Sequence, residues 1–143
     1  MSGYAVATRE DILNEIFRAV AAIWPSTFYV ALLTTNPSDD TGTGLVEVST
    51  TTWTNYARVG VTRASTSWNA PAGGTTSPQT VSNAAAVSFG TATTTANVTV
   101  SGFAIYDAAT AGALWFWSAF TTAPIVQNGD PVSFAAGALV VDQ

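Results

Sequence analysis

Hydrophobic residues near the start of the chain recur at helical spacing. Between Thr8 and Trp24 they fall three or four positions apart, which places them on one stripe of an α-helix. Thr8, followed by Asp11 three residues later, is close to a capping box, and Pro25 is a stop signal. The pattern predicts an amphipathic helix over residues 8–24. We expect its stripe to pack on the same domain, with docking into a neighbouring subunit as the alternative.

Beyond Pro25 the chain consists of short runs rich in Val, Thr and aromatic residues, separated by turn sequences. Residues 27–34 form a nearly continuous apolar run, which is typical of a strand buried on both faces. One helix followed by strands favours a mainly β fold: an antiparallel β-sandwich, or a small barrel, preceded by the N-terminal amphipathic helix. We expect a single domain over residues 1–143. At least six strands are predicted, over residues 27–34, 56–63, 85–89, 98–107, 113–120 and 137–142.

The predicted strand over residues 113–120 has no polar face. Leu114 and Phe116 are expected on one face and Trp115 and Trp117 on the other, because side chains alternate along a strand. A sandwich core accounts for only one of these faces. We expect a symmetry mate to cover the second face, with the N-terminal helix of the same chain as the alternative.

Charge is scarce along the whole chain. Charged residues make up 9% of it and hydrophobic residues 48%, and the net charge is -5. Such a surface suits a protein that packs against copies of itself or a fixed partner. The balance supplies no basic footprint, so nucleic-acid binding is excluded. No segment has the pattern of a secretory signal or the length of a membrane span, so we expect a soluble protein without a membrane partner.

The residue types offer little for catalysis. The chain has no Cys and no His, which removes the commonest general bases and activated nucleophiles. A carboxylate pair would have to come from Glu47, Asp107 and Asp130. Asp107 and Asp130 lie in turn sequences, where Asp normally binds its own backbone. We therefore predict no catalytic residues and a protein that is not an enzyme.

Metal binding has one candidate, a group of oxygen-bearing side chains within and just after the predicted loop over residues 36–44. It lacks the alternating acidic spacing of a recognised calcium loop, and turn-forming side-chain bonds are the favoured interpretation. No metal or cofactor is therefore expected. The group consists of Asn36, Asp39, Asp40 and Glu47.

Aromatic and cationic residues are the candidates for contacts with other molecules. Arg58 and Arg63 are two of only four cations, and we expect at least one to pair with a carboxylate in a loop or at a subunit contact. Core burial is the favoured role of Trp53, Trp68, Trp115 and Trp117, with glycan stacking as the alternative. The loop over residues 69–80 is either a solvated tip or an arm over a neighbour. The candidate oligomer or lattice contacts are Trp115, Trp117, Arg58, Arg63 and Trp68.

Several segments, in order, carry a family resemblance: LLTTNPSDDTGTG (32–44), YARVGVT (56–62), SNAAAVSF (82–89) and FAIYDAATAG (103–112). From the first strand onward the chain is similar to a family of small virion proteins of tailed bacteriophages. These are usually described as phage tail fibre proteins, and some similar proteins are head decoration, or cement, proteins. The resemblance implies a structural protein of the virion, assembled in the host bacterial cytoplasm, with no catalytic residues.

Within that class, a compact chain without heptads or solenoid repeats favours a capsid decoration (cement) protein. It would bind the head lattice as a homo-oligomer, a trimer by preference, so its partners would be itself and the phage major capsid protein. One alternative is a tail fibre or tail-tip component that binds tail proteins. The other is a receptor-binding module for a host glycan.

Overall fold

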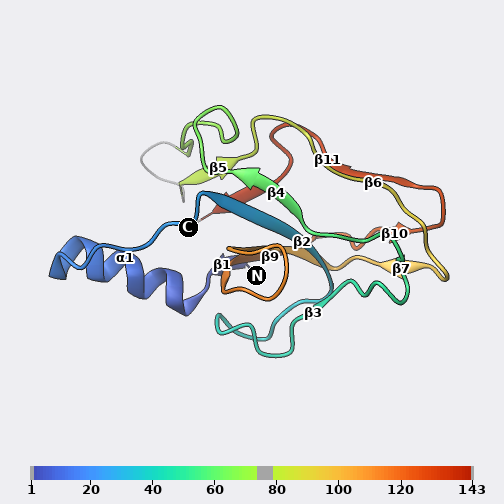
Figure 1. The fold of residues 1–143 in the computed structure, drawn as a ribbon, viewed down its shortest axis with the longest axis horizontal. Helices are drawn as coiled ribbons and strands as arrows, with labels where there is room; N and C mark the ends of the chain where they lie inside the picture. The colour runs from blue at the N-terminus through green and yellow to red at the C-terminus, as the bar shows by residue number, and fades with distance from the viewer. Residues whose placement is uncertain (1, 74–78, 143) are drawn as a thin grey trace.

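A six-stranded antiparallel sheet forms the centre of the computed structural model, which describes residues 2–73 and 79–142 (Figure 1). β2 is the sequence's longest apolar run, and its residues Val30 to Leu33 are buried, which confirms a strand covered on both faces. The order across the sheet is β1 (Ser2–Tyr4), β9 (Leu114–Ala119), β8 (Gly102–Tyr106), β2 (Thr27–Thr35) and β3 (Val46–Glu47), and β4 (Val59–Thr62) also pairs with β2.

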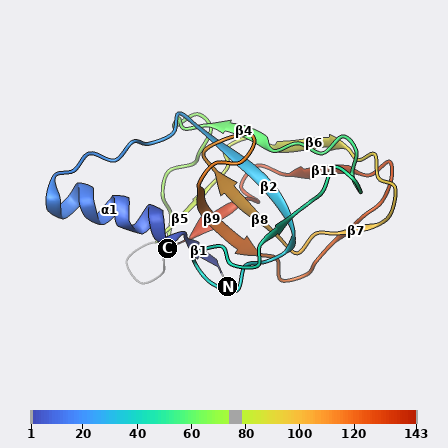
Figure 2. The same cartoon turned by 60° about the horizontal axis from the view of Figure 1, so that its bottom comes forward.

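Three two-stranded antiparallel ladders lie outside this sheet (Figure 2). Their apolar side chains pack on one of its faces. Val87 and the half-buried Phe134, from two of these strands, pack with Phe103 and Phe116 of the large sheet. The mainly β, antiparallel prediction is confirmed, and no sheet within the described residues closes into a barrel. The ladders are β5 (Thr80–Ser82) with β12 (Val140–Asp142), β6 (Val87–Thr91) with β11 (Pro131–Phe134), and β7 (Val98–Thr99) with β10 (Ile125–Val126).

A bulge in β9 changes which side chains share a face. Ile105 pairs with Phe116, but the next residue of β8, Tyr106, pairs with Leu114, so Trp115 is an extra residue. Trp115 and Phe116 consequently join the same core cluster, while Leu114 and Trp117 pack on the other side. The expected strict alternation of these four residues is therefore wrong.

The second face of the large sheet is covered by the chain's own loops. Leu45, at the end of the loop over residues 36–45, packs on the cluster that contains Leu33 and Trp117. The guanidinium of Arg58 lies 3.6 Å from the centre of the Tyr106 ring on the same side. The expectation that a symmetry mate covers this face is wrong, because Trp117 is only 1% exposed within the single chain.

The N-terminal helix, α1 (Val6–Arg18), begins and ends earlier than predicted. Ala5 is its N-cap and makes no side-chain capping bond, so the expected Thr8 cap is wrong. At the other end Ala19 adopts a left-handed φ of 52°, and the N–H groups of Ala19 and Val20 both donate to the Asn14 carbonyl. This C-cap turns the chain back well before Pro25. No helix within the described residues is long and apolar enough to cross a membrane.

Helix α1 stands away from the sheets, and residues 19–26 return beside it to β2 (Figures 1 and 2). The expectation that its apolar stripe packs on the domain is therefore wrong: Leu13, Ile16 and Phe17 are exposed. Residues 6–26, the helix with its return segment, are called the arm below.

Other predicted elements are partly confirmed. The strand expected over residues 56–63 is shorter, at Val59–Thr62, and the one expected over residues 98–107 is divided into β7 and β8. In the loop over residues 69–80, Ala72 and Thr80 form an isolated bridge, while residues 74–78, where an arm over a neighbour was considered, lie outside the described part. The single-domain expectation stays a prediction.

Candidate functional site

The arm is fixed to the body at its first turn. The Thr8 hydroxyl is buried and donates to the Trp115 carbonyl at 3.0 Å. The Val6 N–H donates to the Asp40 carbonyl at 3.1 Å, and the Asp40 carboxylate pairs with Arg9 at 2.9 Å. Because β1 lies just before the helix and pairs with β9, the base of the arm is held on both sides.

Beyond its base the arm is largely exposed, and several of its exposed side chains are large and apolar. Trp24 of the return segment donates from Nε1 to Glu15 Oε2 at 2.9 Å, which ties the two halves of the arm together. The ring of Trp24 also lies 5.6 Å from that of Trp115. The large apolar residues of the arm that are at least half exposed are Leu13 (55%), Ile16 (66%), Phe17 (77%), Val20 (50%) and Ile23 (92%).

A pocket of about 620 Å³ opens in the body among residues that are mostly apolar. Phe28 contacts both Trp68 and Trp115 edge-on along this wall, with ring centres 6.4 and 5.7 Å apart. The Trp68 N–H is buried and has no hydrogen-bond partner among the described residues. We call this cavity the root pocket, because Tyr4 and Trp115, at the base of the arm, line it. The other lining residues are Phe28, Arg63, Ala64, Ser65, Trp68, Asn69, Ala70, Pro71, Val81, Ile105, Phe116 and Val141.

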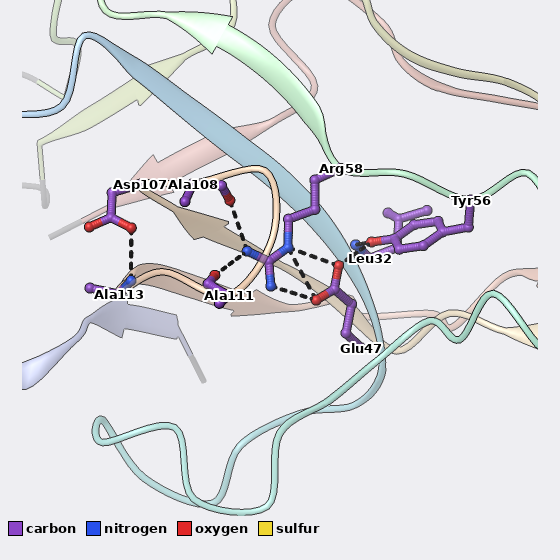
Figure 3. Close-up of polar contacts among 8 residues, drawn as sticks. All are labelled: Leu32, Glu47, Tyr56, Arg58, Asp107, Ala108, Ala111 and Ala113. Carbon is purple, nitrogen blue, oxygen red and sulfur yellow. Dashed lines mark hydrogen bonds and ion pairs between the residues drawn. The ribbon is translucent and has the colours of Figure 1, made fainter.

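A group of polar side chains, called the Arg58 cluster below, lies on the face of the large sheet opposite the root pocket (Figure 3). Arg58 Nη2 lies 2.7 Å from Glu47 Oε2, and Arg58 Nη1 donates to the Ala108 and Ala111 carbonyls at 2.9 and 2.7 Å. The Tyr56 hydroxyl donates to Glu47 and accepts from the Leu32 N–H, both at 2.9 Å. The cluster thus joins β2, β3 and the loop after β8.

The charge states in this cluster are fixed by burial and pairing. Burial opposes the charged form of Arg58, but the hydrogen bonds and charge of Glu47 outweigh it and raise the pKa of Arg58 above its usual value. Burial raises the pKa of Tyr56, and the nearby Glu47 carboxylate adds to the effect. Both shifts keep the Arg58 guanidinium charged and the Tyr56 phenol neutral near neutral pH. The cluster therefore acts as a structural clamp.

The carboxylates considered for catalysis bind their own backbone or an arginine. Asp107 accepts from the Ala113 N–H and Asp130 from the Gln127 N–H, both at 2.8 Å, as their turn sequences predict. Glu47 is held by Arg58. None of these three residues lines the pocket described above.

The carboxylates considered for calcium are also engaged. Asp39 Oδ1 accepts from the Thr41 hydroxyl and from the N–H groups of Thr41 and Thr43. The Thr41 hydroxyl, more than the backbone donors, lowers the pKa of Asp39. Among the described residues no group of three or more Asp, Glu, His or Cys could hold a metal ion. A turn made by side-chain bonds, the favoured interpretation of this segment, is confirmed for Asp39.

A family model described as podophage GP4 fiber I protein gp80 matches residues 3–142. The chain belongs to this family. It is therefore a structural protein of a tailed-phage virion, as the segments between residues 32 and 112 indicated. No curated protein matches the chain.

Within this fibre-family chain, the predicted contact residues fall into two groups. Trp117 is 1% exposed, Trp115 is also buried, and Arg58 is enclosed in its cluster, so their side chains are occupied inside the chain. Arg63 and Trp68 line the root pocket. The expected pairing of one arginine with a carboxylate is confirmed by Arg58 and Glu47, within one chain.

Two features of the site were missed by reasoning from sequence. The helical stripe was recognised, but its exposure was not, because periodicity shows that a face is apolar and not what covers it. The root pocket is assembled from Tyr4, Phe28, Trp68, Trp115 and Val141, which are far apart in the chain. No local pattern marks such a pocket.

Proposed function

We propose that this protein is a non-catalytic, self-associating subunit of the phage fibre apparatus, and that the arm is its assembly surface. The arm is the observation that carries the proposal. The body covers both faces of its main sheet by itself, whereas the arm presents apolar side chains to water. Large exposed apolar surfaces in soluble proteins mark interaction sites. The fibre position is supported by the description of the family.

Decoration of the capsid, the prediction made from the sequence, is the second candidate. The short strands and lack of any long shaft-forming element in residues 2–73 and 79–142 favour it. In that case the partner would be the major capsid protein, and in the fibre case another tail protein. The mainly apolar lining of the root pocket gives less support to a glycan-binding module, for which polar groups must fix each sugar.

Labelling of intact virions separates these positions. A gold-labelled antibody fragment raised against the folded protein would be imaged on phage particles by electron microscopy. We expect label on the tail fibres. Label repeated over the head would replace the fibre proposal with decoration. The control is the same fragment saturated beforehand with purified protein, which should remove all specific label.

A further inference from the structure

Two apolar surfaces of opposite shape occur in this protein, and neither is filled by the other. The arm is convex and exposes Ile16, Phe17 and Ile23 most strongly. The root pocket is concave and is lined by aromatic and aliphatic side chains, and no residue of the arm is among them. Both surfaces are built around the same part of the body, since Tyr4 and Trp115 line the pocket and Trp115 also anchors the arm.

The arm is held in a position that keeps it out of its own pocket. Thr8 and Arg9 fix the first helical turn to Trp115 and Asp40, and Trp24 ties the return segment to Glu15 and packs on Trp115. These contacts fix the first turn of the helix and the end of the return segment, and the helix extends away from the sheets (Figure 1). Filling the pocket with the stripe of the same chain would require breaking them.

We propose that the arm of one copy docks into the root pocket of a second copy of this chain. The proposal rests on the role of the protein as a self-associating subunit and names the surfaces that associate. A helix laid with its apolar face in an apolar groove is a common mode of recognition, read as anchors at spacings of three and four residues. Leu13, Ile16 and Phe17 have that spacing.

The volume of the root pocket and the charges of the two surfaces agree with docking of the arm of a second copy. A volume of about 620 Å³ accepts several apolar side chains, as expected for anchors from a helix. The arm carries three carboxylates against two arginines, and Arg9 is already paired with Asp40. The pocket carries Arg63, whose side chain is exposed and donates from Nε to the Pro25 carbonyl. The net negative charge of the arm is opposite in sign to the charge of Arg63 in the pocket, which favours docking of one copy on another.

The first test measures association of the purified chain by sedimentation velocity over a range of protein concentrations. We expect an oligomer at micromolar concentration. Phe17→Glu should raise the dissociation constant at least ~30-fold, the effect of losing a central anchor. The matched control is Ala7→Glu, which adds the same charge at an exposed position about 80° around the helix from Phe17 and about 15 Å along it. A wild-type chain that remains monomeric, or an oligomer that Phe17→Glu leaves intact, would overturn the proposal.

The second test identifies the surface that the arm contacts. The chain has no Cys, so a Phe17→Cys variant and a tagged Ser65→Cys variant can be mixed and oxidised without competing thiols. Ser65 is exposed and lines the root pocket, so a mixed disulfide is expected. Arg18→Cys is the control, because it is the next position along but lies about 100° around the helix. Equal yields from both pairs, or a predominance of Phe17–Phe17 disulfides, would contradict docking in the pocket.

These results are separable from those of the virion labelling. Docking between copies is measured on the purified chain and does not depend on where the protein lies in the particle. Label over the head with intact arm docking would remove only the fibre position. Fibre label with a monomeric chain would remove only the proposed docking between copies.

Discussion

The Arg58 cluster buries a charged side chain, whereas the arm exposes apolar ones. Arg58 is a permanent cation whose side chain is 9% exposed, yet its guanidinium has a carboxylate, two carbonyls and an aromatic ring as partners. The arm exposes its large apolar side chains instead, and its interactions with the body are made by its first turn and by the end of its return segment. The first region buries a charge that has polar and aromatic partners within the chain, and the second leaves apolar side chains exposed to water.

The difference separates the part of the chain that is complete in the monomer from the part that is not. A buried charge without partners would prevent folding, so the cluster must be satisfied within one chain. An exposed apolar stripe costs little in folding but favours association. The free energy of folding is therefore expected to come from the body, and that of assembly from the arm.

The sharpest test of this division uses one substitution at two leucines. Leu33→Ala removes a fully buried side chain and should lower the free energy of unfolding by about 3 kcal/mol. Leu13→Ala, at an exposed position on the arm, should change it by less than ~0.5 kcal/mol. Urea unfolding followed by tryptophan fluorescence, at concentrations where the chain is monomeric, measures both. Similar losses would show that the arm stabilises the monomer.

Removing the charge of the cluster should cost nearly as much. Arg58→Met leaves Glu47 and two carbonyls without their main partner, and we expect a loss of about 3 kcal/mol in the free energy of unfolding. Glu47 keeps 24% of its side chain exposed, which places the loss at the lower end for a buried pair. Arg63→Met is the control, because its exposed side chain makes one hydrogen bond to a backbone carbonyl. The comparison fails if both substitutions destabilise the protein equally.

The cluster also predicts how stability changes in alkali. Burial raises the pKa of Tyr56 above the ordinary value of 10.0, so the folded chain keeps this proton after the unfolded chain has lost it. Stability is complete below pH 10 and should then fall by about 1.4 kcal/mol per pH unit from this group. Urea unfolding between pH 8 and 11 should show a shallower fall for Tyr56→Phe. Parallel pH profiles would assign the effect to other groups.

The smallest expected loss of stability concerns the hydrogen bond that attaches the arm to the body. Thr8→Val removes the hydroxyl that donates to the Trp115 carbonyl and should cost about 1 kcal/mol, because that carbonyl also accepts from the Ala5 N–H. Thr8→Ser keeps the hydroxyl and should lose less. Thermal unfolding of the two variants measures the difference. An equal loss would mean that the Thr8 methyl group, and not its hydroxyl, holds the arm.

The parts of the fold that were predicted correctly depend on local pattern. The run over residues 27–34 identified β2, because a short, nearly continuous apolar run is typical of a strand covered on both faces. Asp107 and Asp130 were assigned to turns because Asp binds nearby backbone N–H groups, and both do so. These conclusions require no knowledge of distant partners.

The parts that were predicted wrongly depend on neighbours in space. The helix ends at Arg18 because Ala19 adopts a left-handed conformation, for which Ala carries no signal. The bulge at Trp115 moves that side chain to the face of Phe116, and strand alternation alone cannot show it. Strands such as β3 and β10 have two residues each, too few for any periodicity.

Attachment of the arm at both ends has a consequence for the entropy of assembly. An isolated helix of 13 residues is mostly unfolded in water, so a loose N-terminal peptide would have to become ordered each time it bound. Here β1 pairs with β9 before the helix and Trp24 packs on Trp115 after it, so the ordering is completed when the body folds. The binding segment of each subunit is therefore already formed before association, and association loses less conformational entropy.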